Sequence, residues 1–130
     1  MMRTLTGIFI ILHGLVHLWY VVLSYQWIEY QPDMGWNGQS WLFSTFLKQR
    51  TLRSITGILF ILAAFAFVAS GIGVFIQADW LNPVLLSSAV FSTLLLVLFW
   101  DGSPEMIVQK GLLGVLINLV IIAVILINRG

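Results

Sequence analysis

The chain has 130 residues, of which 60% are hydrophobic and 8% are charged, and its formal net charge is +1. Ordinary globular proteins carry about a quarter charged residues, and a soluble domain of this size has too little interior to bury so much apolar surface. The composition therefore predicts an integral membrane protein. The even charge balance, without a basic tract, argues against nucleic acid as a partner and against a polybasic lipid anchor. The absence of cysteine excludes disulfides, thiolate metal sites and thiol redox chemistry.

Four apolar stretches are each suited to cross a bilayer, whose hydrocarbon core of about 30 Å takes roughly 20 helical residues. The predicted spans are 4–25, 54–77, 83–100 and 104–127. Gly111 is an alternative start for the last of them. The first stretch resembles a signal peptide, but its apolar run is long and no small-residue cleavage site follows Ser24, so we expect a retained span.

Capping signals and aromatic residues mark the span ends. Asn82 followed by Pro83 supplies an N-cap and a proline at the first helical position of the third span, and Ser103 with Pro104 does the same for the fourth. Aromatic residues, which are typical of membrane interfaces, stand near these ends. They are Trp19, Tyr20, Tyr25, Trp80 and Trp100.

The long connection between the first two spans contains a second helical pattern. Within 40–49 the apolar and polar residues fall on opposite faces of a helix, which predicts a short amphipathic helix lying in the interface. The predicted fold is therefore an all-α membrane protein. It is a single domain, 1–130, with four antiparallel transmembrane helices and this interfacial helix.

Two segments of the chain repeat each other. Residues 3–12 and 53–62 match at six of ten positions, each with an arginine four residues before a glycine. Descent from a duplicated hairpin would explain the match. A common need for a snorkelling cation and a small packing residue at a span start would explain it equally well.

The basic residues predict an orientation. Arg3 and Arg129 flank one side of the predicted spans, and the other side carries Lys48, Arg50, Arg53 and Lys110. The positive-inside rule therefore places the first and third loops in the cytoplasm and both termini outside. The aromatic, acid-bearing segment 30–36 of the first loop would also suit an extracytoplasmic surface.

Two histidines inside the first span are the most informative polar residues. His13 and His17 are four residues apart, so they share one face of a helix, and ionisable groups in membranes face a bundle interior or a water-filled cavity. At similar depth the third and fourth spans offer further polar side chains. The predicted mid-membrane ligand-binding pocket consists of His13, His17, Ser88, Ser92 and Asn118.

Several roles are open to this set of residues. The simplest is hydrogen bonding that holds the helices together, with neutral histidines. A zinc protease motif fails because Gly14 occupies the position of the required glutamate, and Asp101 and Glu105 lie too near the membrane surface to complete a metal site. We therefore assign no metal.

Haem or quinone is the alternative ligand. Both histidines lie on one face and the chain has no third, so a bis-histidine haem would need another subunit, whereas a five-coordinate haem or a quinone hydrogen-bonded to a ring N–H stays possible in a single chain. A cavity for an apolar or amphiphilic molecule, or for a proton, is the third option. No nucleophile triad, carboxylate pair or glycine-rich phosphate loop supports catalysis.

The sequence also offers a second, shallower candidate site near the membrane surface. Asp101 follows the third span in the sequence Trp-Asp-Gly, where capping of the turn is its simplest role. The functional alternative is an interfacial site made by Trp36, Trp41, Asp101 and Lys110.

Three short motifs carry a resemblance to known proteins: 13–18 (His-Gly-Leu-Val-His-Leu), 38–41 (Gly-Gln-Ser-Trp) and 99–102 (Phe-Trp-Asp-Gly). Over most of its length the chain resembles small prokaryotic four-helix membrane proteins that are DoxX-like in layout. The resemblance implies the topology and a prokaryotic cytoplasmic membrane, and it transfers no site residue. The predicted role is a non-enzymatic bundle that binds an apolar or amphiphilic ligand, or a subunit of a homo-oligomer or larger membrane complex. The alternative is a redox subunit holding haem or quinone on His13 and His17.

Overall fold

The computed structural model describes residues 2–28, 39–100, 102 and 111–129. Its elements are α1 (Met2–Ser24), the 3-10 turn η2 (Phe43–Thr45), α2 (Gln49–Ile76), α3 (Leu81–Leu98) and α4 (Leu113–Arg129). The all-helical fold agrees with the prediction, and α1, α2 and α3 are long and apolar enough to cross a membrane. The apolar part of α4, Leu113–Ile127, is shorter than a full span.

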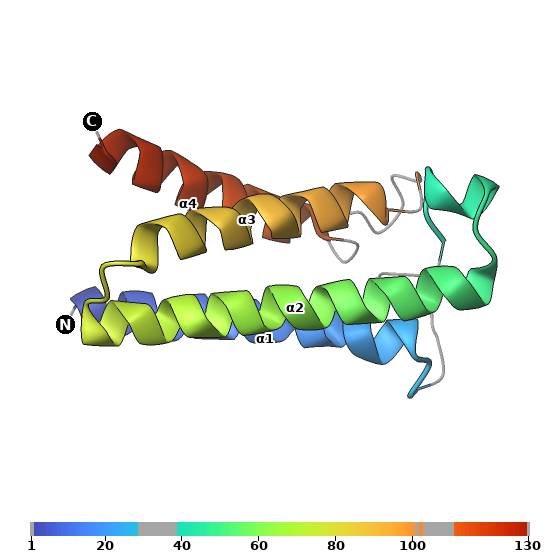
Figure 1. Cartoon of the computed structure of the whole chain (residues 1–130), viewed down its shortest axis with the longest axis horizontal. Coiled ribbons are helices and arrows are strands. Elements are labelled where there is room, and N and C mark those ends of the chain that lie inside the picture. Colours follow the sequence, from blue (N-terminus) through green and yellow to red (C-terminus); the bar gives the residue numbers. More distant parts are fainter. Residues whose placement is uncertain (1, 29–38, 101, 103–110, 130) are drawn as a thin grey trace.

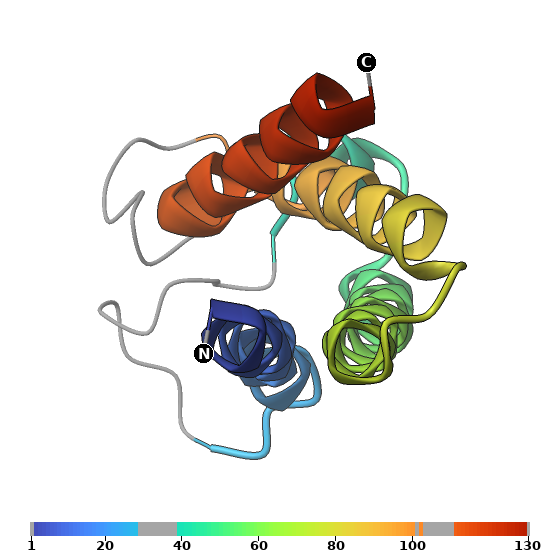
Figure 2. The ribbon, with the colours of Figure 1, turned by 90° about the vertical axis from the view of Figure 1, so that its left-hand side faces the viewer.

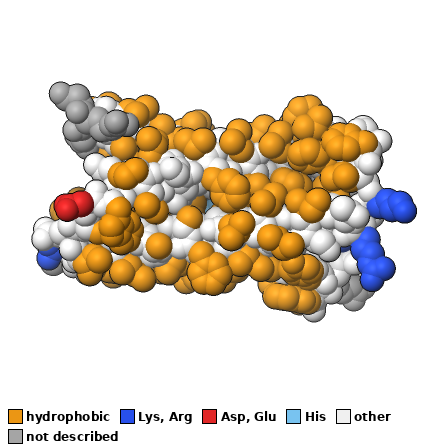
Figure 3. Space-filling view, in the orientation of Figure 1, with side chains coloured by type: hydrophobic (Ala, Val, Ile, Leu, Met, Phe, Trp, Pro, Cys, Tyr) orange, Lys and Arg blue, Asp and Glu red, His pale blue; other side chains and the backbone are white. Residues whose placement is uncertain are grey.

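The helices pack in chain order, α1 against α2, α2 against α3, and α3 against α4 (Figure 1). α1 and α4 are the first and last helices of this series. In the view along the helices the series curls round, so that α1 and α4 face each other across one side of the bundle (Figure 2). We call the boundary between these two helices the α1–α4 seam. Apolar side chains cover the face seen in Figure 3, and Lys and Arg side chains gather at the end where α2 begins.

Three helices begin earlier than predicted, and for α1 the difference is small, because it begins at Met2 rather than at residue 4. α2 begins at Gln49 rather than at residue 54, after Lys48 in an extended conformation (φ −67, ψ 148), and its first three residues are polar. α3 begins at Leu81, and its N-cap is Trp80 rather than Asn82. Pro83 fits inside the first turn because the N–H groups there have no partner within the helix. The predicted start at Ser103 and Pro104 lies outside the described residues.

The interfacial helix predicted at 40–49 does not form, and this expectation is corrected: one 3-10 turn, η2, takes its place. The backbone N–H groups of Leu42 and Phe43 donate to Oγ of Ser40, and the N–H of Ser40 donates to Oγ of Ser44. Such side-chain bonds to the local backbone compete with helical hydrogen bonds.

The same segment is also fixed to the end of α3. The backbone N–H and the indole N–H of Trp41 donate to the carbonyls of Trp100 and Val97, both at 2.7 Å, and the Ser40 hydroxyl donates to the carbonyl of Leu98. The last carbonyls of a helix lack partners within it. The segment after residue 39 therefore caps α3 instead of forming a helix.

Glycines allow α1 and α2 to approach closely. A Cβ at Gly7 would lie 2.7 Å from the ring of Phe75, and a Cβ at Gly57 would lie 2.5 Å from the ring of Tyr25. The two pairs are related by the same 50-residue offset as the repeated segments 3–12 and 53–62. The antiparallel pair of helices is thus approximately two-fold symmetric at these contacts, which gives the repeat a structural counterpart.

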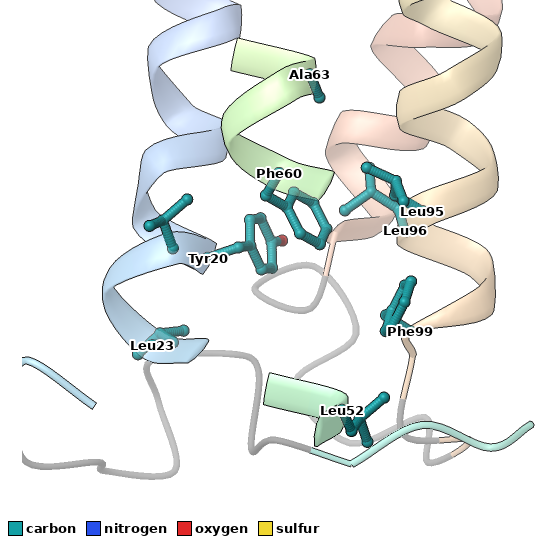
Figure 4. Close-up of a cluster of buried hydrophobic side chains, with 9 residues drawn as sticks. Tyr20, Leu23, Leu52, Phe60, Ala63, Leu95, Leu96 and Phe99 are labelled. Atoms are coloured by element: carbon teal, nitrogen blue, oxygen red, sulfur yellow. The ribbon is translucent and has the colours of Figure 1, made fainter. Parts of the chain in front are cut away.

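The apolar core has two parts, one toward each end of the molecule. At the end where α2 begins, Tyr20 stacks on Phe60 (ring centroids 4.8 Å apart) beside Leu95 and Leu96 of α3 (Figure 4). The cluster toward the other end is built from Ile10, Phe67, Val74, Leu85, Ala89 and Ile125. Along α1 and α3, the polar residues described next fall between these two clusters.

Candidate functional site

Four buried polar side chains from three helices meet between the two apolar clusters. His13 and His17 come from α1, Ser92 from α3 and Asn118 from α4. Their exposed fractions are 7%, 3%, 0% and 0%. We call these residues the polar cluster. It joins α1 to both α3 and α4, and it spans the α1–α4 seam.

Short hydrogen bonds connect the cluster into one chain. Nε2 of His13 lies 2.7 Å from Oδ1 of Asn118, and Nδ2 of Asn118 lies 2.9 Å from Oγ of Ser92. Oγ of Ser92 in turn lies 2.5 Å from Nε2 of His17. The other ring nitrogen of His17, Nδ1, lies 3.0 Å from the backbone carbonyl of His13. This series of hydrogen bonds therefore begins at the ring of His13 and ends at its backbone carbonyl.

The carbonyl contact sets the direction of every other bond in the cluster. A carbonyl only accepts, so a neutral His17 carries its proton on Nδ1, and its Nε2 must accept the proton of the Ser92 hydroxyl. Ser92 then accepts from the Asn118 amide, whose oxygen faces a proton on Nε2 of His13. The two histidines are thus opposite tautomers, and flipping the Asn118 amide would leave two acceptors facing each other.

Aromatic rings and a glycine fix the two imidazoles in place. The ring of Phe67 packs against both, with centroid distances of 4.8 Å to His13 and 5.2 Å to His17. Phe9 lies parallel to His13 at 6.3 Å. α2 reaches this position because Gly14 stands between the histidines, where a Cβ would lie 2.6 Å from Cβ of Phe67. The residue that excludes the zinc protease motif is thus a packing residue.

One ring nitrogen of the cluster has no hydrogen-bond partner among the described residues. It is Nδ1 of His13, which the tautomer of that ring leaves as an acceptor. The His13 side chain as a whole is 7% exposed. It is therefore the ring nitrogen that the other described members of the cluster do not use.

The structure places the fifth predicted pocket residue elsewhere. The hydroxyl of Ser88 donates to the carbonyl of Val84 in its own helix, at 2.7 Å, and forms no bond to the polar cluster. Ser88 lines an open groove of about 550 Å³ between α2 and α3 instead. Phe67, which contacts both histidines, was missed by sequence reasoning because a phenylalanine in an apolar span carries no signal of its own.

The second predicted site is described only in part. Trp41 is placed, and its indole N–H is used to cap α3, as described above. Trp36, Asp101 and Lys110 lie outside the described residues. The structure therefore leaves the interfacial site as a prediction.

A metal ion or a haem iron on Nε2 of either histidine would disturb the polar cluster. Among the described residues, no group of three His, Cys, Asp or Glu side chains comes together as a metal site. Nε2 of each histidine already takes part in a hydrogen bond, and both ring nitrogens of His17 are engaged. A haem iron on Nε2 would have to displace Asn118 or Ser92, so the observed donor set does not fit an axial ligand.

Comparison with protein-family models, with curated proteins and with solved structures finds no match to this chain. The resemblance to DoxX-like proteins therefore stays a prediction from three short motifs.

Proposed function

We propose that the chain is a four-span protein of a prokaryotic cytoplasmic membrane that binds a small amphiphile through His13. The observation that supports this function most directly is Nδ1 of His13, an acceptor with no partner among the described residues, on a ring that is buried and fixed by hydrogen bonding. An acceptor without a partner inside a membrane is unfavourable, and a bound donor removes that cost. The polar cluster holds the ring in the orientation that presents this atom.

The α1–α4 seam is the proposed entry for the ligand. Among the described helices, α1 and α4 are the two that end the packing series, and the bond from His13 to Asn118 connects them. A molecule with an apolar body would lie along the lipid-facing side chains of these helices, many of which are exposed, including Phe9, Leu12 and Leu116. Its polar group would reach His13.

The tautomers restrict the chemistry of that polar group. Both ring N–H groups in the cluster already donate, one to Asn118 and one to a backbone carbonyl, so the cluster offers no free ring donor to a quinone carbonyl. A hydroxyl or an amide N–H would instead donate to Nδ1 of His13. This favours a hydroxylated amphiphile, including the reduced, hydroxyl form of a quinone, over an oxidised quinone.

The test uses the protein purified in mild detergent, its visible spectrum, and native mass spectrometry of the small molecules that it retains. His13→Gln is the decisive variant, because the glutamine amide can still donate to Asn118 while its acceptor, Oε1, does not stand at the position of Nδ1. We expect it to fold and to lose the retained ligand. Ser88→Ala is the matched control and should retain the ligand, because Ser88 lies outside the polar cluster.

Two results would contradict the proposal. One is a wild-type protein that retains no small molecule, and the other is equal ligand content in His13→Gln and wild type. A Soret band in the visible spectrum would favour the haem alternative, and would require the polar cluster to open.

A further inference from the structure

A cavity open to the surface lies where α1 ends and α2 begins, at the opposite end of the α1–α2 pair from Gly7. Its volume is about 700 Å³, within the range of small-molecule sites. Its described lining is polar and contains no acidic residue; the residues that matter here are Gln26, Gln49, Arg50, Arg53 and Ser54. No part of the ligand site proposed at His13 contributes to it.

The two arginines occupy different positions in this cavity. Arg53 donates from Nη1 to the carbonyls of Leu23 and Ser24, at 2.7 and 3.5 Å, so its guanidinium is fixed against the last turn of α1. Arg50 is one helical turn earlier and exposed, and it forms no hydrogen bond or ion pair with the described residues. The i, i+3 spacing of Arg50 and Arg53 in α2 thus places two permanent positive charges at one cavity.

The start of α2 adds to the positive potential of the cavity. Its first turn contains no acidic residue, and Lys48 at the N-cap provides no side-chain hydrogen bond to the first N–H groups. The N-terminal end of a helix carries partial positive charge, which favours an anion. A phosphate accepts several hydrogen bonds at once. The two guanidinium groups, the N-terminal end of α2 and the hydroxyl of Ser54 could together donate to one.

The end of α1 and the aromatic residues beside the cavity lead us to expect it at the depth of lipid headgroups. α1 changes there from apolar helix to polar turn, and Tyr25 and Trp27 stack beside it with ring centroids 5.6 Å apart. Aromatic side chains of this kind are typical of the membrane interface. Lys and Arg side chains mark the same end of the molecule (Figure 3).

We propose that this cavity binds the phosphate of an anionic ligand, supplied by the headgroup of an anionic phospholipid or by free phosphate. The inference depends on the embedding of α1 and α2 in a membrane and is independent of the ligand proposed at His13. In this proposal the exposed side chain of Arg50 extends to the phosphate, whereas Arg53 contacts the phosphate from a position fixed by the carbonyls of α1.

The first arm of the test measures lipid preference. The protein is placed in nanodiscs of equal parts phosphatidylcholine and phosphatidylglycerol, and the lipids that it retains are counted by native mass spectrometry. We expect retained phosphatidylglycerol to exceed phosphatidylcholine, and Arg50→Gln to lower that ratio about fivefold, the effect of one basic residue at an anionic surface. Arg50→Lys should restore part of the preference.

Arg3→Gln is the matched control, because it removes the same charge at the other end of α1 and should leave the ratio unchanged. The second arm uses phosphatidylcholine nanodiscs titrated with inorganic phosphate and followed by ³¹P NMR. Binding that depends on Arg50 in this arm identifies free phosphate as the source. The proposal is overturned if Arg50→Gln and Arg3→Gln lower the lipid ratio equally, or if neither arm shows binding that depends on Arg50. Thermal unfolding of each variant verifies that it is folded.

Discussion

At the scale of single residues, the polar cluster is governed by one backbone carbonyl. The contact from His17 to the carbonyl of His13 fixes the proton of His17 on Nδ1, and the remaining bonds follow in a single direction. Protonation of His17 would turn its Nε2 into a donor and remove the acceptor that Ser92 needs. The arrangement described here therefore belongs to neutral histidines.

Ser92 and Ser88 provide a matched pair of variants, since both are buried on the same face of α3. Ser92→Ala removes the acceptor for Asn118 and the donor to His17, and we expect it to lower the free energy of unfolding by about 1–2 kcal/mol. Ser88→Ala loses one hydrogen bond within its own helix and should change the free energy of unfolding by less than about 0.5 kcal/mol. Unfolding in mixed detergent micelles measures both values. Equal losses would mean that the polar cluster contributes no more than a serine in any span.

At the scale of elements, close contacts between helices decide the geometry of the cluster. Gly14 lets Phe67 of α2 lie against both imidazoles, and the first loop occupies the C-terminal carbonyls of α3 through Ser40 and Trp41. Neither feature binds anything by itself. Both keep α1 and α3 at the positions from which the polar side chains meet.

Gly14→Ala should destabilise the α1–α2 pair. The added Cβ would lie 2.6 Å from Cβ of Phe67 and 3.1 Å from the backbone oxygen of Ala64, atoms that cannot move without moving α2. We expect a loss of about 1–3 kcal/mol in the free energy of unfolding, as for overpacked cores. Gly114→Ala is the control, since its Cβ would meet only the end of the flexible Leu96 side chain, at 3.1 Å. A stable Gly14→Ala variant would show that the contact is looser than described.

Trp41→Phe tests the cap on α3. The substitution keeps an aromatic ring but removes the N–H that donates to the carbonyl of Val97, and we expect a loss of about 0.5–1.5 kcal/mol. Hydrogen exchange of the last amides of α3 should accelerate accordingly. Trp27→Phe is the comparison, because the ring of Trp27 stacks on Tyr25 without such a cap. Unchanged exchange in Trp41→Phe would contradict the capping role.

At the scale of the whole molecule, an apolar cluster lies on each side of a polar centre, and the polar centre connects the first helix to the last. The helices expose many large apolar side chains, which suits a surface in contact with lipid rather than with water. The length of α4 is the point on which the topology depends, because its described apolar part, Leu113–Ile127, spans about 22 Å at 1.5 Å per residue.

The proposed four-span topology is tested by single cysteines, for which the chain is suited because it has none of its own. We expect a membrane-impermeant maleimide to label Met2→Cys and Gly130→Cys from one side and Thr51→Cys from the other. The positive-inside rule further predicts that position 51 is cytoplasmic. Labelling of positions 2 and 130 from opposite sides would show that α4 does not cross the membrane.

The sequence predicted that α1, α2 and α3 are long and apolar enough to cross a membrane, because apolar length is a direct signal, and it predicted which spans carry polar groups. It could not separate Ser88 from Ser92, which lie four residues apart on one face, because the choice depends on the register of α4 and the height of Asn118. The prediction of a helix at 40–49 was wrong for a related reason. Its amphipathic pattern is real, but the hydroxyl of Ser40 and the open carbonyls of α3 offer the backbone better partners.

The early start of α2 was also hidden from the sequence. Hydropathy marks where the chain becomes apolar, whereas the helical backbone continues through the polar turn that carries Arg50 and Arg53. A search for apolar spans therefore could not predict the cavity at that turn.

The most direct test of the polar cluster is the tautomeric state of its two histidines, measured by ¹⁵N NMR of the imidazole nitrogens in ¹⁵N-histidine-labelled protein in nanodiscs near neutral pH. His13→Gln identifies which of the two sets of signals belongs to His17. The structure predicts two neutral rings of opposite type, with the proton on Nε2 in His13 and on Nδ1 in His17. Two rings of the same tautomer, or rings that exchange between tautomers as in free imidazole, would contradict the hydrogen-bonded cluster on which the account is built.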